Sequence, residues 1–215
     1  MPPLPLPGSR GNFFYGVLMA VQNKIKPRFL WTLIWLVAAL VLVWYVVFQR
    51  EPKKQLESLL IDDTLYASEI KRTADKHGLP PQLVRALIRK ESGFDYRAKG
   101  NAGEIGLMQI LPRGAVADWA RINKKRTPST MELYNVELNL EIGCWYLARA
   151  LNKWKNYRYA YELALAEYNA GGKNTARWKP DSVNGDVISR IDFPQTRNYV
   201  QEIMGHYRRY CAESK

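Results

Sequence analysis

The sequence predicts a mainly α-helical protein, with a single N-terminal transmembrane helix followed by one folded helical domain. The first observation is a run of 19 uncharged residues, 30–48, which as a helix would span a bilayer core. The second is that apolar residues beyond this run recur at helical spacing, without clear strand alternation or an internal repeat. The third is length, because the 215 residues leave enough chain after the run for a domain with its own core.

The charges on the two sides of the apolar run predict its orientation. Basic residues but no acidic residue precede it, whereas acidic and basic residues are mixed after it. Since cytoplasmic flanks carry the excess of Lys and Arg, we expect the C-terminal part to be exported. A cleaved signal peptide is the alternative, but no A-x-A-like site follows the run. The predicted parts are a cytoplasmic, partly disordered, Pro-rich N-terminus (1–29), a transmembrane signal anchor (30–48), a linker (49–63) and the folded domain (64–215).

Six helical segments are predicted in the domain. Gly78 suits the end of the first, and Pro80-Pro81 suits the first turn of the second. Apolar residues from Leu140 to Leu151 share one face of the fourth, and Gly171-Gly172 ends the fifth. The segments are 64–77, 81–92, 107–119 in part, 130–153, 159–168 and 195–210.

Composition excludes some classes of function without choosing among the others. The formal net charge of +12 suits a polyanionic partner, which includes nucleic acid, anionic lipid or an acidic cell-wall polymer. No nucleic-acid motif or zinc-ligand cluster appears, so we expect no nucleic-acid partner, metal or cofactor. The only histidines, His77 and His206, argue against a histidine-rich metal site and a Ser-His-Asp triad. Cys144 and Cys211 lack metal spacing, and we favour two separate thiols over a disulfide.

Glu91 is the candidate catalytic acid. Apolar residues at 84, 87 and 88 occupy one helical stripe, and Glu91 falls on that same stripe one turn later. Its carboxylate should therefore point toward the interior or a cleft, where desolvation raises the pKa and favours the protonated form that a general acid needs. The alternative is a buried, hydrogen-bonded glutamate with a purely structural role.

Four motifs follow one another along the domain. The motifs are Glu91-Ser92-Gly93-Phe94, Gly106-Leu107-Met108-Gln109-Ile110-Leu111-Pro112, Ala166-Glu167-Tyr168-Asn169-Ala170-Gly171 and Ile191-Asp192-Phe193-Pro194-Gln195-Thr196-Arg197-Asn198-Tyr199-Val200. In this order and spacing they resemble the soluble lytic transglycosylase (SLT) domain, a lysozyme-like family related to goose-type lysozyme. The similarity covers roughly residues 64 to 207.

This resemblance implies a lysozyme-like α fold with a groove for glycan strands. The family acts on peptidoglycan, which it cuts between N-acetylmuramic acid and N-acetylglucosamine. The family acid corresponds to Glu91, and it works alone and leaves a 1,6-anhydro ring without consuming water, metal or cofactor. The implied location is a bacterial inner membrane with the domain in the periplasm, and no protein partner is indicated. The implied groove residues are Ser92, Met108, Gln109, Tyr168 and Asn169, with Tyr199 matching the tyrosine of the last motif.

Ordinary structural roles compete with these assignments. Ser92 and Asn169 could cap helix ends, Gln109 could lie on the surface, and Met108 and the two tyrosines could be core packing.

The chain also departs from the family pattern. In the last motif, Asp192 replaces a proline of the family pattern and Gln195 replaces a glutamate. Glu167 replaces an alanine in the third motif, and Tyr96 replaces a proline just after the first. Two other functions therefore stay open. One is a muramidase that uses Asp95 or Glu104 as a second carboxylate. The other is a non-catalytic peptidoglycan-binding scaffold.

Overall fold

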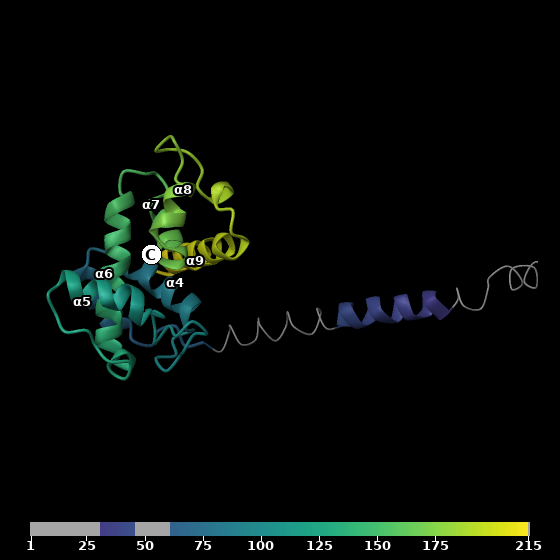
Figure 1. Ribbon diagram of the computed structural model, residues 1–215, viewed down its shortest axis with the longest axis horizontal. Coiled ribbons are helices and arrows are strands. Elements are labelled where there is room, and N and C mark those ends of the chain that lie inside the picture. The colour runs from purple at the N-terminus through teal and green to yellow at the C-terminus, as the bar shows by residue number, and fades with distance from the viewer. Residues whose placement is uncertain (1–30, 46–60, 215) are drawn as a thin grey trace, which may run out of the picture. The chain divides into compact units, whose positions relative to one another are not determined.

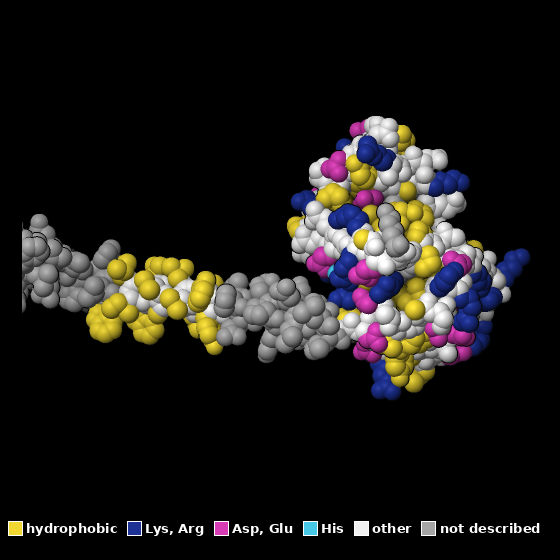
Figure 2. All heavy atoms as spheres, turned by 180° about the vertical axis from the view of Figure 1, so that it is seen from behind, with side chains coloured by type: hydrophobic (Ala, Val, Ile, Leu, Met, Phe, Trp, Pro, Cys, Tyr) yellow, Lys and Arg dark blue, Asp and Glu magenta, His cyan; other side chains and the backbone are white. Residues whose placement is uncertain are grey.

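The computed structural model describes residues 31–45 and 61–214, and the chain divides into two compact units between Leu60 and Ile61 (Figure 1). Residues 31–45 of the first unit are one α-helix, with apolar side chains exposed along it (Figure 2). Among the described residues, no helix is both long and apolar enough to cross a bilayer. Residue 30 and residues 46–48 of the predicted anchor lie outside the described residues, as do 1–29 and 49–60.

The second unit is mainly α-helical, as predicted. Its described residues contain no strand, and only isolated bridges join Ile105 to Lys99 and to Ile110. The last three residues of the predicted linker, 61–63, belong to this unit. The elements are α3 (Ala67–Lys76), α4 (Pro81–Glu91), the π-helical turn η1 (Pro112–Val116), α5 (Ala117–Ile122), the 3₁₀ turn η2 (Glu132–Tyr134), α6 (Val136–Trp154), α7 (Ala160–Ala170), α8 (Gly172–Trp178), the 3₁₀ turn η3 (Ile188–Arg190) and α9 (Pro194–Glu213).

One predicted segment needs correction. The continuous helix expected at 130–153 is interrupted at Asn135, whose side chain accepts a hydrogen bond from the Leu138 backbone N–H (3.0 Å) and so begins α6 as an N-cap. The glycines expected to end the fifth predicted helix do end it, since Gly171 (φ 80°) is the C-cap of α7. Gly171 is also the N-cap of α8, a short helix that the sequence analysis did not predict.

Helix α7 forms the centre of the domain. Its residues 163–166 are all buried, so the helix is covered on every side rather than along one stripe. It packs against α6 and α9, while α4 packs against α9 and α3 (Figure 1). This arrangement brings the end of α4, which carries Glu91, beside the α9 residue Tyr199.

Both cysteines lie in helices of this domain. Cys144 is buried in α6, Cys211 is partly exposed in α9, and each is a free thiol. The prediction of two separate thiols is confirmed.

Candidate functional site

Glu91 is the last residue of α4, and the chain reverses immediately after it. Gly93 (φ 59°) and Phe94 (φ 69°) both adopt left-handed backbone conformations. Such a conformation is easy for glycine and uncommon for phenylalanine. Phe94 is buried, so core packing can stabilise this turn. The reversal leaves the Glu91 carboxylate at the end of a helix, next to the loop that carries the second motif.

Burial and hydrogen bonding act on Glu91 in opposite directions. Burial raises the pKa of Glu91 to about 7, although the hydrogen bond that the Tyr199 hydroxyl donates to Glu91 Oε1 lowers it. The nearby charge of Glu104 raises the pKa further, and that of Lys90 lowers it. Because burial dominates, Glu91 can hold a proton near neutral pH and can also accept one.

The second motif forms a tight loop against the end of α4. The Ser92 hydroxyl donates to the Leu107 carbonyl oxygen (2.8 Å) and to that of Ile88 (3.3 Å). The Gln109 side-chain amide donates to the carbonyl oxygens of Ala98 (3.1 Å) and Gly106 (2.9 Å). Both predicted groove residues therefore use donors to shape the loop, and their contact with a substrate stays a prediction.

Asn139 of α6 holds this loop from behind, and it is a residue that sequence reasoning missed. Its buried side chain accepts from the Met108 backbone N–H (2.9 Å) and donates to the carbonyl oxygens of Ile105 (2.8 Å) and Leu133 (2.9 Å). One turn later, a Cβ at Gly143 would lie only 2.4 Å from Met108 Sδ. An amide and a glycine four residues apart within a helix were the signal that could have revealed this contact.

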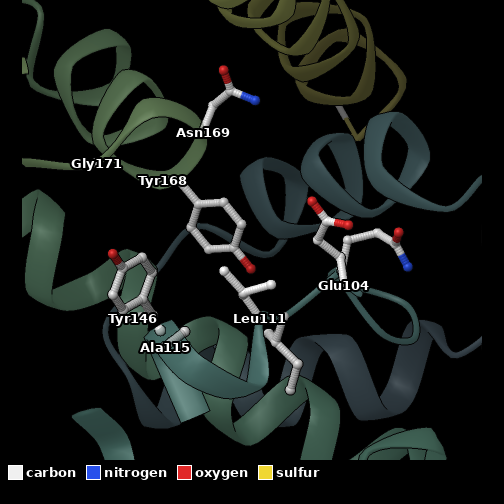
Figure 3. A pocket seen from close by; sticks show the side chains of 10 residues that line it. Glu104, Leu111, Ala115, Tyr146, Tyr168, Asn169 and Gly171 are labelled. Carbon is white, nitrogen blue, oxygen red and sulfur yellow. The ribbon is translucent and has the colours of Figure 1, made fainter. Parts of the chain in front are cut away.

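A cleft of about 220 Å³ lies between this loop and α7 (Figure 3). The Tyr168 hydroxyl donates to the Met108 carbonyl oxygen (2.8 Å), and its ring meets the Tyr146 ring edge to face at 5.5 Å. Figure 3 shows Glu104 on the opposite side of Tyr168 from Tyr146. Sequence reasoning missed Tyr146. The lining residues are Glu104, Gln109, Ile110, Leu111, Gly114, Ala115, Tyr146, Tyr168, Asn169 and Gly171.

Asn169 joins the third motif to the last one. Its Oδ1 accepts a hydrogen bond from the Thr196 hydroxyl (2.8 Å) at the start of α9, and the residue is exposed at the cleft. Asn169 lies within α7 and does not cap it, since Gly171 occupies the C-cap position. Aromatic rings beside exposed amides can accommodate the apolar faces and the hydroxyl rim of a sugar ring.

The two candidate second carboxylates occupy different positions. Asp95 is exposed, and its Oδ1 accepts from the Arg97 backbone N–H (2.8 Å), as expected of a turn residue. Glu104 lines the cleft and accepts from the Ala102 backbone N–H (3.0 Å). Of the two, only Glu104 is placed where a substrate in the cleft could meet it.

The departures from the family pattern make contacts of their own. Glu167 accepts from the Trp154 indole N–H (2.7 Å), and Asp192 accepts from the Trp178 indole N–H (2.6 Å). Each also pairs with a cation, Lys153 (2.8 Å) and Arg177 (2.9 Å) respectively. The Tyr96 hydroxyl accepts from Arg97 Nε (2.8 Å), and Gln195 is exposed. Within residues 31–45 and 61–214, no group of three or more His, Cys, Asp or Glu side chains could hold a metal ion.

Comparison with known proteins places this geometry in a family. The soluble lytic murein transglycosylase of Escherichia coli K12 is 28% identical over 156 residues, which are 70% of this chain and 24% of that protein. The membrane-bound lytic murein transglycosylase C of Actinobacillus pleuropneumoniae serotype 5b is 27% identical over 168 residues, 67% of this chain and 45% of that protein.

A solved structure has the same fold. An inactive glutamate-to-glutamine mutant of the lytic transglycosylase Slt from Pseudomonas aeruginosa superposes with a TM-score of 0.59 at 28% identity, covering 67% of this chain and 23% of that one. The lysozyme-like α fold implied by the motifs is thereby confirmed. The chain spans less than half the length of each of these three relatives. Residues 68–187, more than half of the chain, match the family model described as the transglycosylase SLT domain, and the chain therefore belongs to this family.

Proposed function

We propose that the protein is a membrane-anchored lytic transglycosylase that cleaves peptidoglycan between N-acetylmuramic acid and N-acetylglucosamine and leaves 1,6-anhydro-N-acetylmuramic acid ends. The observation that carries this proposal is the state of Glu91. Its pKa of about 7 and its hydrogen bond from Tyr199 support a carboxyl group that can act first as acid and then as base near neutral pH.

The proposed reaction needs both roles of Glu91 in succession. Glu91 gives its proton to the glycosidic oxygen as the bond from that oxygen to the muramic acid C1 breaks. The acetamido oxygen of the same sugar stabilises the positive charge that develops at C1. The Glu91 carboxylate then takes the proton of the C6 hydroxyl, whose oxygen bonds to C1. Glu91 ends protonated, as it began, and no water is consumed.

Tyr168 and Asn169 are proposed to bind the sugars directly. Both line the cleft, and one offers an aromatic ring while the other offers an exposed amide. Ser92, Met108 and Gln109 are proposed to act through the loop they form beneath the substrate, because their hydrogen bonds hold that loop. Tyr199 is proposed to orient Glu91.

The membrane anchor is part of the proposal. It rests on the uncharged run at 30–48 and on the basic residues before it. A relative described as membrane-bound supports it as well. We propose a single-pass location in the bacterial inner membrane, with the SLT domain in the periplasm and glycan strands as its partner.

One observation favours a second candidate. Glu104 lines the cleft and its charge acts on Glu91, so it could serve as the base of a muramidase that uses water instead of the C6 hydroxyl. In a muramidase, Glu104→Gln should abolish cleavage, whereas in a lytic transglycosylase it should leave the 1,6-anhydro product.

The test is digestion of purified peptidoglycan by the full-length protein in detergent, beside Glu91→Gln and Glu104→Gln. We expect soluble fragments from the wild type and from Glu104→Gln, and none from Glu91→Gln. Retained binding of Glu91→Gln to peptidoglycan would separate lost chemistry from lost affinity. A folded wild type that binds peptidoglycan but releases no fragments would contradict the proposal and favour a scaffold.

A further inference from the structure

The carboxylate of Asp63 is held by side chains from two helices. From α4, Arg85 Nη2 (2.8 Å) and Arg89 Nη1 (3.1 Å) donate to it. From α9, the Tyr210 hydroxyl (2.7 Å) and Arg209 Nη2 (3.4 Å) donate to it. Asp63 itself precedes α3, at the start of the domain. We refer to these five residues as the Asp63 staple.

The staple is partly shielded from water and specific in geometry. The Arg89 side chain is 8% exposed and that of Asp63 is 20% exposed. Arg85 also donates from Nε to the Asp63 backbone carbonyl oxygen (2.8 Å), and its guanidinium lies 3.8 Å from the centre of the Tyr210 ring. Although burial alone would raise the pKa of Asp63, hydrogen bonds from Tyr210 and Arg85 hold it below its usual value. The ionised carboxylate is therefore the form that joins the helices.

The two helices joined in this way are those that carry the proposed acid and its partner. Arg89 precedes Glu91 by two residues on α4, and Tyr199 lies on α9. The hydrogen bond from Tyr199 to Glu91 crosses the same pair of helices. Residues 61–63 also lie close to the turn after Glu91, since a Cβ at Gly93 would lie 3.4 Å from Ile61 Cδ1.

We propose that Asp63 is a positioning residue of the active site, which sets α4 against α9 so that Tyr199 meets Glu91. This inference rests on the proposed function. It also makes the last three residues of the predicted linker, 61–63, a functional part of the catalytic domain rather than a tether.

The pH dependence of the reaction can separate positioning from a general loss of folding. The groups that act directly on the pKa of Glu91 are Tyr199, Glu104 and Lys90, and the nearby Tyr168 responds to the Glu91 charge. Asp63 is not among them. A change in the pH profile of an Asp63 variant would therefore report altered geometry between Glu91 and Tyr199.

The experiment compares Asp63→Asn and Tyr210→Phe with Asp62→Asn in the full-length protein, using soluble glycan oligomers. Asp62→Asn is a matched control, because Asp62 is exposed and its carboxylate accepts its described hydrogen bonds only from the neighbouring Thr64. For Asp63→Asn we expect kcat to fall about 10- to 100-fold with KM unchanged, since small misplacements of reacting groups cost that much. Tyr210→Phe should lower kcat less, and Asp62→Asn should match the wild type.

A second comparison uses the Tyr199→Phe background. If Asp63 acts through Tyr199, Asp63→Asn should move the basic limb of the pH–rate profile to higher pH when Tyr199 is present. In the Tyr199→Phe background, Asp63→Asn should leave the basic limb where it is. Equal losses of kcat in both backgrounds, or an unshifted profile with wild-type Tyr199, would overturn the proposal. An inactive wild type would instead overturn the proposed function. Denaturant unfolding and circular dichroism of each variant identify any that fails to fold, and Tyr210→Phe then supplies the same comparison with a smaller change.

Discussion

At the scale of the residue, the protonation of Glu91 is set by a competition that burial wins. Its pKa rises from 4.5 to about 7 despite the hydrogen bond from Tyr199. The folded state therefore prefers the protonated carboxyl group. The contribution of protonated Glu91 to the stability of the folded state is complete below the unfolded pKa of 4.5. It is lost as the pH rises through about 7.

The first prediction follows from this linkage. As the pH rises from about 5 to about 8, the unfolding free energy of the wild type should fall. That of Glu91→Gln should fall by about 2 kcal/mol less, a value that allows for the partial exposure of Glu91. Urea unfolding at a series of pH values measures it. Asp95→Asn, which removes an exposed carboxylate four residues away, is the control. Parallel curves for the wild type and Glu91→Gln would contradict the raised pKa.

Tyr199 gives a second prediction at this scale. Tyr199→Phe removes a hydrogen bond that lowers the pKa of Glu91, so this pKa should rise. Because the proposed reaction starts from protonated Glu91, the fall in activity at high pH should move to higher pH. The rate at the optimum should also fall, since Glu91 loses its orienting contact. The measurement is a pH–rate profile. The control is Tyr157→Phe, because the Tyr157 ring packs against Trp154 and Tyr157 is not among the groups that act on the pKa of Glu91. An unmoved basic limb would count against the proposed role of Tyr199.

Sequence reasoning predicted the buried position of Glu91 but not most of its surroundings. A carboxylate on an apolar helical stripe is visible in the periodicity, and burial follows from it. Tyr199 was assigned only through the motif resemblance, because its contact with Glu91 joins residues 108 positions apart. Asn139 and Tyr146 lie on α6, whose polar positions carry no mark of what they face until the loop and α7 are placed against them.

At the scale of the element, α6 provides the support for the loop of the second motif. Asn139 satisfies three backbone groups of that loop and its surroundings, and Gly143 leaves room for the Met108 side chain. The cleft therefore depends on a helix that contributes neither Glu91 nor Tyr199.

Two helical glycines offer a matched test of this support. Gly143→Ala places a Cβ 2.4 Å from Met108 Sδ, whereas a Cβ at Gly205 of α9 meets nothing within 4 Å. Alanine is favoured over glycine inside a helix by about 1 kcal/mol, so Gly205→Ala should stabilise the protein by about that amount. Gly143→Ala should instead destabilise it by about 1–3 kcal/mol through overpacking, and it should reduce cleavage. The comparison uses denaturant midpoints; equal stabilisation by both changes would show that Met108 yields freely.

The elements themselves were predictable where periodicity was long and clear. Segments 64–77, 81–92, 159–168 and 195–210 correspond to α3, α4, α7 and α9, with shifts of a few residues at their ends. The short helix α8 was missed because two consecutive glycines resemble a stop, while in the fold Gly171 turns the chain into a new helix. Asn135 interrupts the fourth predicted segment through a side-chain cap, a choice that hydrophobic spacing does not reveal.

At the scale of the whole molecule, the proposed anchor would hold the SLT domain at the membrane. The full-length protein should stay in the membrane pellet after alkaline carbonate washing. Ala39→Arg places a charge in the middle of the run at 30–48, which costs about 3 kcal/mol for insertion and should shift protein to the supernatant. Val183→Arg, at an exposed site of the SLT domain, is the control. Release of the wild type by carbonate would contradict the anchor.

The overall fold and the family could be predicted because four separated motifs occur in order. The match of residues 68–187 to the family model confirms the family. The contacts of Asp63 with α4 and α9 could not be predicted from the sequence. Asp63 precedes its partners in these helices by 22 to 147 residues. Taken alone, residues 49–63 are a mainly polar stretch between an apolar run and a helix, and this pattern predicts only a linker.

The central claim is that Glu91 closes a 1,6-anhydro ring on muramic acid without water. Mass spectrometry of the fragments released from purified peptidoglycan tests it most directly, with Glu91→Gln digested in parallel. Our account predicts fragments one water lighter than hydrolysis products from the wild type, and no fragments from Glu91→Gln. Fragments with the mass of hydrolysis products, ending in free reducing sugars, would contradict it and make the protein a muramidase.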